Sequence, residues 1–321
     1  MILSTIDNIP EISNKISIAR KKSKWKMIKR DWRLYVILAI PMALLTIFSY
    51  LPMVGILMAF QEFDFRKGYL LSPWIGLKYF KMFIASPLFW QLLLNTIYIS
   101  VYSFVAGFFV PIILAIVVNE IRNSFFRKTV QLVTYAPYFI STVVMVGIIL
   151  QLLSPRTGLV NQLIVALDGN DINFMGDSSL FRHIYVWSGV WQGAGYGSII
   201  YIAALAGIDP ELYQAATIDG ATKFQRLRHI DIPGISPTIV ILLILSIGGI
   251  LGVGFEKIYL MQNLMNLRIS EVISTYVYKV GIQQSQYSFS ASVGFFNSVA
   301  SFILLLIANF IARRVSEVSL W

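Results

Sequence analysis

Long apolar stretches recur along this chain, and they restrict what it can fold into more than any other feature. A helix rises about 1.5 Å per residue, so roughly 20 apolar residues cross a hydrocarbon core of about 30 Å. Runs of that length occur six times, and we expect each to be a membrane-spanning helix. The six expected spans are residues 35–60, 90–119, 129–153, 184–207, 235–260 and 291–312.

The composition supports a membrane protein and excludes several kinds of site. Of the 321 residues, 57% are hydrophobic and only 13% are charged, against about 25% charged in ordinary soluble proteins. The chain has no Cys and only two His, which excludes disulfides and thiolate sites and disfavours a multi-histidine metal centre. We therefore predict an all-α integral membrane protein of six transmembrane helices with no metal site. Residues 1–34 form a basic segment, 35–312 the membrane domain and 313–321 a tail.

The basic residues are unevenly placed, and their distribution predicts the orientation. Nine Lys and Arg residues crowd into residues 1–34. With six spans, 17 of the 26 Lys and Arg residues lie on the side that holds both termini, the turn 120–128 and the loop 208–234. An excess of Lys and Arg marks the cytoplasmic side, so we place both termini there. We interpret the basic segment as a solvated tail beside anionic lipid rather than a nucleic-acid site. It is either disordered or an amphipathic surface helix, as Ile16, Ile18, Trp25 and Ile28 indicate.

Proline and glycine residues interrupt several of the expected spans. In a bilayer these residues are tolerated where neighbouring helices satisfy the backbone. One interpretation is close helix packing through small residues. The other is a break or a thin wall where a solute passes. The residues concerned are Pro41, Pro52, Pro111, Pro137, Gly193, Gly195, Gly197, Gly248, Gly249, Gly252 and Gly254.

The loop 208–234 is polar and long, and it predicts a helix, a turn and a second helix. Asp209 is a suitable N-cap, followed by Pro210 at the first helical position. Asp219 and Gly220 indicate a turn, because Gly adopts positive φ at little cost. We expect the second helix over 221–230, ended by Pro233.

Within this loop, Gln214-Ala215-Ala216, Gly220 and Ile230-Asp231-Ile232-Pro233 resemble the cytoplasmic signature of permease subunits of binding-protein-dependent ABC importers. The signature of that family starts with Glu-Ala-Ala, so Gln214 is a departure that removes a charge and puts a salt bridge to the ATPase in doubt. The resemblance implies that the loop is a coupling helix docking on the ATPase. The implied coupling residues are Pro210, Glu211, Gln214, Ala215, Ala216, Asp219, Gly220, Lys223 and Arg226, with Arg228 as a further charged candidate.

The resemblance covers the whole six-span region. The stretch from Trp191 to Tyr196 is similar to sugar and oligosaccharide importers, among them the lipoprotein-B-like polysaccharide permeases and the alginate importers. This implies a bacterial inner-membrane protein that works with a second permease subunit, two cytoplasmic ATPase subunits and an extracytoplasmic solute-binding protein. No phosphate-binding Gly-x-x-x-x-Gly-Lys-Ser/Thr loop occurs in the chain, so ATP and Mg are expected on the partner ATPases and this subunit is not an enzyme.

Carbohydrate binding needs aromatic faces beside amide and hydroxyl groups. The resemblance places Gly193 and Tyr196 at the sugar site, and the same stretch supplies Trp191 and Gln192. A packing seam is the alternative for each of them. Gly254, Glu256 and Lys257 are further candidates, although Glu256 and Lys257 are adjacent and point to different helix faces. For an acidic oligosaccharide, the candidate cations are Lys257, Arg268, Lys279, Arg182 and His183.

Other functions stay open at this point. The outward segments hold 9 basic against 7 acidic residues, which does not decide between an acidic and a neutral substrate. An ion-coupled secondary carrier would need buried acidic or histidine residues that the spans almost lack. A membrane enzyme lacks a recognisable catalytic cluster, and a purely structural subunit or a lipid-surface loop does not explain the ordered loop 208–234.

Overall fold

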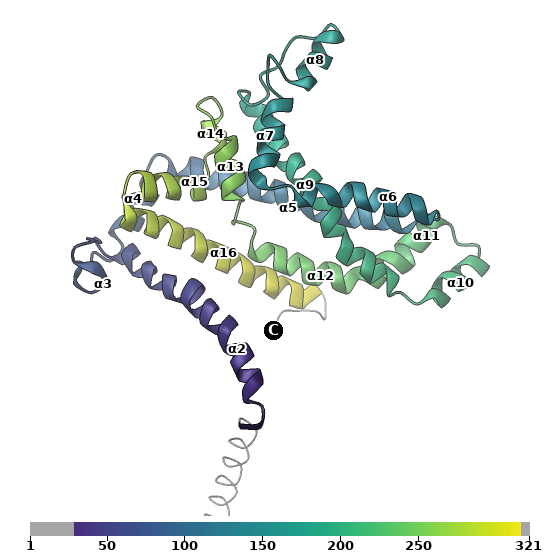
Figure 1. The fold of residues 1–321 in the computed structure, drawn as a ribbon, viewed down its shortest axis with the longest axis horizontal. Coiled ribbons are helices and arrows are strands. Elements are labelled where there is room, and N and C mark those ends of the chain that lie inside the picture. Colours follow the sequence, from purple (N-terminus) through teal and green to yellow (C-terminus); the bar gives the residue numbers. More distant parts are fainter. Residues whose placement is uncertain (1–28, 316–321) are drawn as a thin grey trace, which may run out of the picture. The chain divides into compact units, whose positions relative to one another are not determined.

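The computed structural model describes residues 29–315 of the chain (Figure 1). Most of the predicted basic segment and residues 316–321 of the predicted tail lie outside this range, as does the possible amphipathic surface helix. The chain divides into two compact units, one ending at Leu57 and the other beginning at Met58. Each is described by itself.

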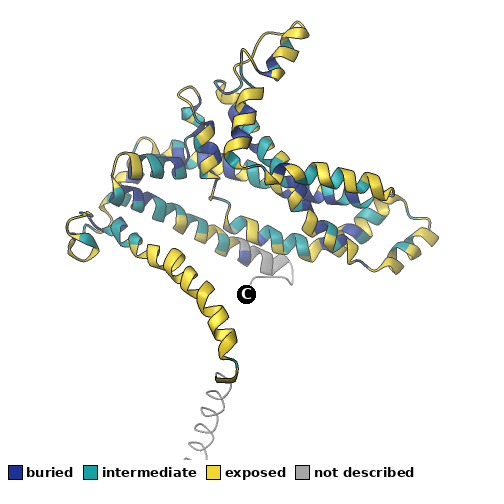
Figure 2. Ribbon diagram, viewed as in Figure 1, coloured by how far each residue is buried: buried dark blue, intermediate teal, exposed yellow. Residues whose placement is uncertain are grey.

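The first unit contains α2 (Trp32–Leu45) and a π-helical turn, η2 (Thr46–Tyr50). A 3-10 segment, η3 (Leu51–Phe60), begins in this unit and ends in the next. None of the α2 side chains is buried (Figure 2). Apart from Arg33 in its first turn, the helix consists of apolar and aromatic residues on all sides. A helix that is hydrophobic all round is suited to a lipid environment or to contact with a partner subunit.

The second unit is helical, with a single isolated β-bridge between Gln61 and Trp74 in the described residues. Its elements are α3 (Gly68–Leu71), α4 (Lys78–Ile84), α5 (Phe89–Asn119), α6 (Ser124–Tyr135), η4 (Ala136–Phe139), α7 (Thr142–Leu152), α8 (Leu159–Ala166), α9 (Ser178–Ala206), α10 (Pro210–Ile218), α11 (Lys223–Arg226), η5 (Leu227–Asp231), α12 (Ile232–Gly248), α13 (Phe255–Met261), α14 (Leu267–Ser270), α15 (Ile273–Tyr278), η6 (Lys279–Gln283) and α16 (Tyr287–Val315).

The centre of this unit is the packing of α5 against α9, which run side by side (Figure 1). Two buried clusters lie along this pair. One joins Ile99 of α5 and Val186 of α9 to Met145 of α7, and the other joins Phe108 and Leu205 to Ile235 of α12. A third cluster packs α4 and the start of α5 against α16 through Phe83, Leu92 and Phe289 among others. The α5–α9 pair is thus the scaffold on which α7, α12 and α13 are placed.

Four helical stretches of the described chain are long and apolar enough to cross a membrane. A pair of helices bent by 102°, Ser124–Phe139 and Thr142–Leu152, raises the number to five if it counts as one span. The helix α9, which covers the expected fourth span, is not among them, and its Ser, Gln and Gly residues explain why. The four stretches are Trp32–Phe60, Phe89–Asn119, Lys223–Ile247 and Tyr287–Ile307.

The expected third span is broken rather than straight. The chain turns at Pro137 and Ile140, after which Ser141 caps α7 by accepting a hydrogen bond from the Val144 N–H. Proline removes a backbone donor, which ends the first segment. The Gln192 Nε2 of α9 donates to the Ile140 carbonyl over 2.8 Å, so a carbonyl freed by the break is satisfied from the neighbouring helix.

The expected fifth span is not one helix either, which corrects the sequence interpretation. The helix α12 ends at Gly248 and α13 begins only at Phe255. The intervening segment contains Gly249, Gly252 and Gly254, and each glycine costs about 1 kcal/mol in a helix relative to alanine. For this glycine group a chain break is therefore the correct interpretation.

A second correction concerns Pro233. The helix after Gly220 does not end there, since α11, the π turn η5 and α12 form one continuous helical stretch from Lys223 to Ile247. Pro233 occupies the first turn of α12. Because the preceding π turn alters the hydrogen-bond register, the missing N–H of proline is tolerated at this point.

The glycines of α9 pack closely instead of breaking the helix. A Cβ atom at Gly195 would collide with the backbone carbonyl of Thr134 in α6, and one at Gly197 would lie 3.3 Å from the Pro111 ring of α5. Gly193 differs, because nothing lies within 4 Å of the position of its Cβ. The packing interpretation therefore holds for Gly195 and Gly197.

We predict that Gly195→Ala destabilises the protein by about 1–3 kcal/mol, because the added methyl group overpacks the contact between α6 and α9. The matched control is Gly193→Ala on the same helix, which has free space and should leave the unfolding temperature unchanged or slightly raised. Thermal unfolding of the detergent-solubilised variants measures the difference. Equal unfolding temperatures for the two variants would contradict the close packing of Gly195 against α6.

Candidate functional site

Two neighbouring cavities lie along the seam of α5 and α9. The first, called the central cavity, has a volume of about 410 Å³ and also borders α12 and the glycine-rich break. The second, called the Lys257 cavity, has a volume of about 310 Å³. Both are bounded by Ser103, Gly107, Pro111, Tyr185 and Gly197, so one wall is common to them.

Some of the residues predicted to bind a sugar line one of these cavities, and others do not. Gln192 and Gly193 line the Lys257 cavity, and Gly254 lines the central cavity. Trp191 and Tyr196 line neither and are 53% and 45% exposed. The Tyr196 ring stacks on Tyr138 at a centroid distance of 3.9 Å, so one ring face is already covered.

Lys257 is a buried cation on the wall of its cavity. Lys257 belongs to α13, and the residue is only 9% exposed. The ammonium donates a hydrogen bond to the Tyr185 carbonyl over 2.8 Å and lies 4.8 Å from the centre of the Tyr185 ring. A Cβ atom at Gly189 would lie 3.1 Å from the ammonium nitrogen, so the glycine leaves room for it.

Glu256 lies apart from Lys257. Its residue is exposed, whereas Lys257 is buried, and the ion pairs among the described residues do not join the two. The expectation that these neighbours point to different faces is confirmed. Lys257 has no carboxylate partner within the described part of the chain.

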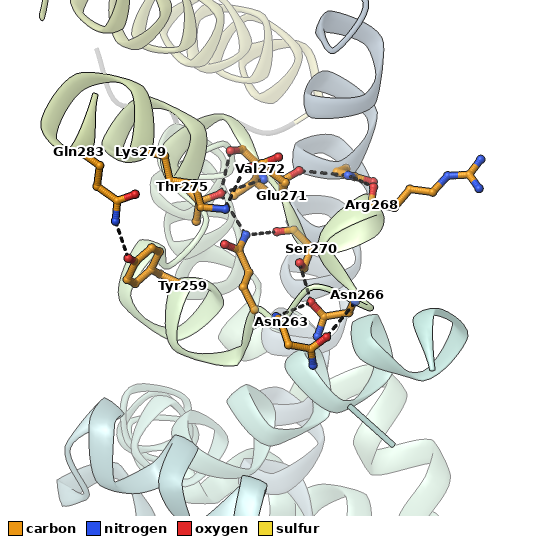
Figure 3. Close-up of polar contacts among 12 residues, drawn as sticks. Tyr259, Asn263, Asn266, Arg268, Ser270, Glu271, Val272, Thr275, Lys279 and Gln283 are labelled. Carbon is orange, nitrogen blue, oxygen red and sulfur yellow. Dashed lines mark hydrogen bonds and ion pairs between the residues drawn. The ribbon is translucent and has the colours of Figure 1, made fainter. Parts of the chain in front are cut away.

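The other candidate cations have different surroundings. Lys279 forms an ion pair with Glu271 over 2.9 Å, and both side chains are largely buried. Arg268 is exposed, and its side chain extends away from the polar network drawn in Figure 3. Arg182 donates to Asn95, and His183 is hydrogen-bonded to Tyr102. Lys279 is thus neutralised within the chain, whereas Arg182 and Arg268 have no carboxylate partner among residues 29–315.

Two serines of α5 that were not predicted from the sequence also belong to this site. Ser100 and Ser103 line the central cavity, and both hydroxyl oxygens are buried without a hydrogen-bond partner in the part of the chain that the structure describes. Ser246 of α12 and the Tyr185 ring complete a polar part of the same wall. The sequence pattern that could have predicted them is a pair of serines at positions i and i+3 in an otherwise apolar run, which places both on one helix face.

The helix pair α10 and α11 has the local structure that its sequence predicts. Asp209 caps α10 by accepting from the Glu211 N–H over 2.9 Å, and Gly220 adopts a φ of +70° in the turn. Thr222 and Gln225 form a reciprocal capping box at α11. Ala215 is exposed, and so are three large apolar side chains of the pair: Leu212, Ile218 and Phe224.

Contacts within the chain hold this helix pair in place. Lys223 forms an ion pair with Glu120 at the end of α5 over 3.1 Å. The Tyr213 hydroxyl donates to the buried Asp231 carboxylate over 2.6 Å. Burial and this hydrogen bond raise the pKa of Tyr213 above its ordinary value, so the hydroxyl stays a donor at physiological pH. Arg226 is half-buried, and its Nε has no hydrogen-bond partner in the described chain.

Comparison with known proteins shows the family to which a chain with these cavities and this helix pair belongs. Residues 107–317 match the family described as the binding-protein-dependent transport system inner membrane component. The chain belongs to this family. The matched region contains the α10–α11 pair and most of the residues that line both cavities, whereas Ser100, Ser103 and Phe104 of α5 precede it.

The permease is similar to two proteins of Bacillus subtilis (strain 168). It is 40% identical to Protein LplB over 92% of each chain. It is also 40% identical to the polygalacturonan/rhamnogalacturonan transport system permease protein YteP, over 93% of this chain and 92% of the relative. A solved structure of a bacterial alginate ABC transporter in complex with alginate pentasaccharide-bound periplasmic protein has a chain that matches with a TM-score of 0.85 and 38% identity. The match covers 92% of this permease and 99% of that chain.

These matches confirm the family that the sequence resembled, including its polysaccharide branch. The protein is a multi-pass permease of the inner membrane with an all-α fold. The relative YteP is a permease protein of a transport system, in agreement with the family description. The roles of the individual site residues stay predictions.

We predict that Tyr213→Phe loosens the α10–α11 pair, because the buried Asp231 carboxylate loses a hydrogen bond worth about 1–3 kcal/mol. Hydrogen–deuterium exchange of residues 210–226 should become faster in this variant. Tyr138→Phe, which retains its stacking on Tyr196, is the control and should leave exchange in that segment unchanged. Unchanged exchange in Tyr213→Phe would show that the bond does not hold the pair.

Proposed function

We propose that this permease is one of two membrane subunits of an ATP-driven importer that takes up an acidic oligosaccharide. An extracytoplasmic binding protein delivers the substrate, and two cytoplasmic ATPase subunits bind ATP and Mg. Two relatives support the acidic substrate, since polygalacturonan and alginate are both polymers of uronic acids that carry a carboxylate on each sugar. The cavities on the α5–α9 seam carry the proposal, because they combine unpartnered hydroxyls with a buried cation.

The proposed arrangement has six spans with both termini in the cytoplasm. Four apolar stretches, the bent pair and α9 make up the six. The low apolar content of α9 supports its place beside the solute path, because a helix that borders a polar cavity needs fewer apolar residues than one surrounded by lipid. The membrane domain is then 35–312, with the coupling loop 208–234 on the cytoplasmic side.

The α10–α11 pair is proposed to dock on an ATPase subunit. Its residues Pro210 to Arg226 present small and apolar side chains at a rigid turn, and α11 continues directly into α12. A movement of the docked pair would therefore displace α12, which borders the central cavity. Such rigid-body transmission is a common way of coupling two sites. Gln214 is exposed and contributes hydrogen bonding without charge to this surface, whereas Lys223 is engaged by Glu120.

In the cavities, hydroxyl groups of Ser100, Ser103 and Ser246 are proposed to bind sugar hydroxyls. Gly193 and Gly254 let the substrate approach the backbone, and Gln192 holds the bent span. Lys257 is proposed to bind a uronate carboxylate through a charge-assisted hydrogen bond. Trp191, Tyr196 and Glu256 lie outside these cavities and are proposed to contact substrate only where the assembled transporter widens the path.

Isolation of the intact complex from native membranes in mild detergent tests the importer. We expect a second permease and an ATPase subunit with a phosphate-binding loop to copurify. Gly220→Val should abolish ATPase copurification, since valine is strained at a φ of +70°. Gly220→Asn is the matched control, because asparagine tolerates this conformation and should retain the complex. Recovery of the chain alone, active in uptake driven by an ion gradient, would overturn the proposal in favour of a secondary carrier.

We predict that Lys257→Gln lowers the uptake of an acidic oligosaccharide by about tenfold at saturating loaded binding protein, as expected for loss of one charge-assisted hydrogen bond. When the carboxylates of the same oligosaccharide are reduced to alcohols, Lys257→Gln and the wild type should take it up equally fast. Glu256→Gln, at the exposed adjacent position, is the control. An equal loss for both forms would show that Lys257 only holds α13 against α9, and unchanged uptake of both would favour a neutral substrate.

A further inference from the structure

A third cavity, called the Arg182 pocket, lies beyond the two cavities of the proposed path. It has a volume of about 500 Å³ and is formed by α5, α9 and α14. It shares no lining residue with the central cavity or the Lys257 cavity. The side chains that matter for its chemistry are Tyr98, Tyr102, Arg182 and His183.

Arg182 is held rigidly on the wall of this pocket. Its Nη2 donates to the Asn95 Oδ1 over 2.9 Å. Asn95 is 4% exposed, and its amide nitrogen donates to the backbone carbonyls of Arg268 and Glu271. The guanidinium carbon also lies 5.0 Å from the centre of the Tyr98 ring. A guanidinium fixed in this way loses little side-chain entropy when it binds a ligand.

The positive charge of Arg182 is not neutralised within the described residues. None of the ion pairs found there includes it, and its buried Nε makes no hydrogen bond. The nearby Asp177 is engaged in capping α9, where it accepts from the Ser179 backbone and side chain. These two hydrogen bonds lower the pKa of Asp177, which is the carboxylate of a helix cap rather than a partner for the guanidinium.

His183 supplies a second donor. The Trp187 indole N–H donates to the Tyr102 oxygen over 2.8 Å, and this oxygen lies 2.9 Å from the His183 Nδ1. The indole can only donate, so the Tyr102 oxygen accepts from it, and the direction of the bond with Nδ1 depends on the His183 tautomer. In the tautomer whose Nδ1 accepts from Tyr102, the ring proton is on Nε2, and the exposed side chain can donate it to a ligand.

Aromatic surface adjoins these donors. Tyr98 is 56% exposed and Trp187 is 50% exposed. The apolar C–H faces of a sugar ring bind to aromatic rings of this kind, while its polar groups bind to convergent donors. A fixed guanidinium, an imidazole N–H and open aromatic faces therefore match a sugar that carries a carboxylate.

We infer that the Arg182 pocket binds one uronate residue of the oligosaccharide before the oligosaccharide enters the α5–α9 cavities. This inference rests on the proposed function and names a second subsite for the same substrate. Arg182 binds the carboxylate, His183 donates to a carboxylate or hydroxyl oxygen, and Tyr98 and Trp187 contact the ring. In the proposed orientation the pocket faces the side from which the binding protein delivers the substrate.

Photolabelling of the intact complex in neutral-lipid liposomes tests the inference directly. The probes are trimers of galacturonate and of mannuronate that carry a diazirine group, applied without binding protein. We expect labelled peptides from the segment 95–102 or 182–187 in the wild type. Arg182→Gln should weaken labelling about tenfold, as expected for a lost charge-assisted hydrogen bond, and Arg182→Lys should restore part of it. Carboxyl-reduced trimers should not compete.

Arg156→Gln is the matched control, because it removes the same charge from an exposed residue outside the pocket. Equal weakening in both variants would show long-range attraction by net charge and overturn the site. Absence of labelling in the wild type, or equal competition by carboxyl-reduced trimers, would also overturn it. Displacement of the probes by phosphatidylglycerol, but not by unlabelled uronate trimers, would assign the pocket to lipid. Copurification of the ATPase and second permease is scored separately, so failure of this pocket can be distinguished from failure of the importer to assemble.

Discussion

The packing of α5 against α9 is the interaction on which the rest of the second unit depends. Small residues make it possible, since Gly197 allows the Pro111 ring to approach, and Gly195 allows the backbone of α6 to do so from another direction. Because backbones approach closely, side chains cannot fill the space at every level. The seam therefore combines tight contacts with two cavities, and its glycines serve both.

Two of the neighbouring helical stretches are broken, and one of the breaks borders the central cavity. The bend at Pro137 and the glycine-rich segment between α12 and α13 bring irregular backbone to the seam. Irregular backbone inside a membrane protein is stable only where other groups satisfy it or where it borders a polar cavity. Gln192 does the first at Ile140, and Gly252 and Gly254 illustrate the second at the central cavity. Residues that weaken a helix are thus concentrated where a solute path is proposed.

The charged residues also differ between the polar network and the cavities. Lys279 and Glu271 neutralise each other in the polar network that joins α14 and α15 (Figure 3). Lys257 and Arg182 have no carboxylate partner in the described chain, although each is held by neutral groups. Burying a cation without a counter-ion is costly unless a ligand can supply the opposite charge. The proposed acidic oligosaccharide would supply a carboxylate to the buried Lys257 and to the half-buried Arg182.

The sequence by itself determined the membrane class, the family and the local structure of the α10–α11 pair, because apolar length, capping residues and a positive-φ glycine are local properties. It also correctly separated Glu256 from Lys257. Only the tertiary structure decided which α9 residues line a cavity, since Gln192, Trp191 and Tyr196 are equally plausible in a helical pattern. It also showed that Pro233 continues a helix and that the glycines near 250 interrupt one. Those outcomes depend on which neighbour satisfies the backbone, and that neighbour is distant in sequence.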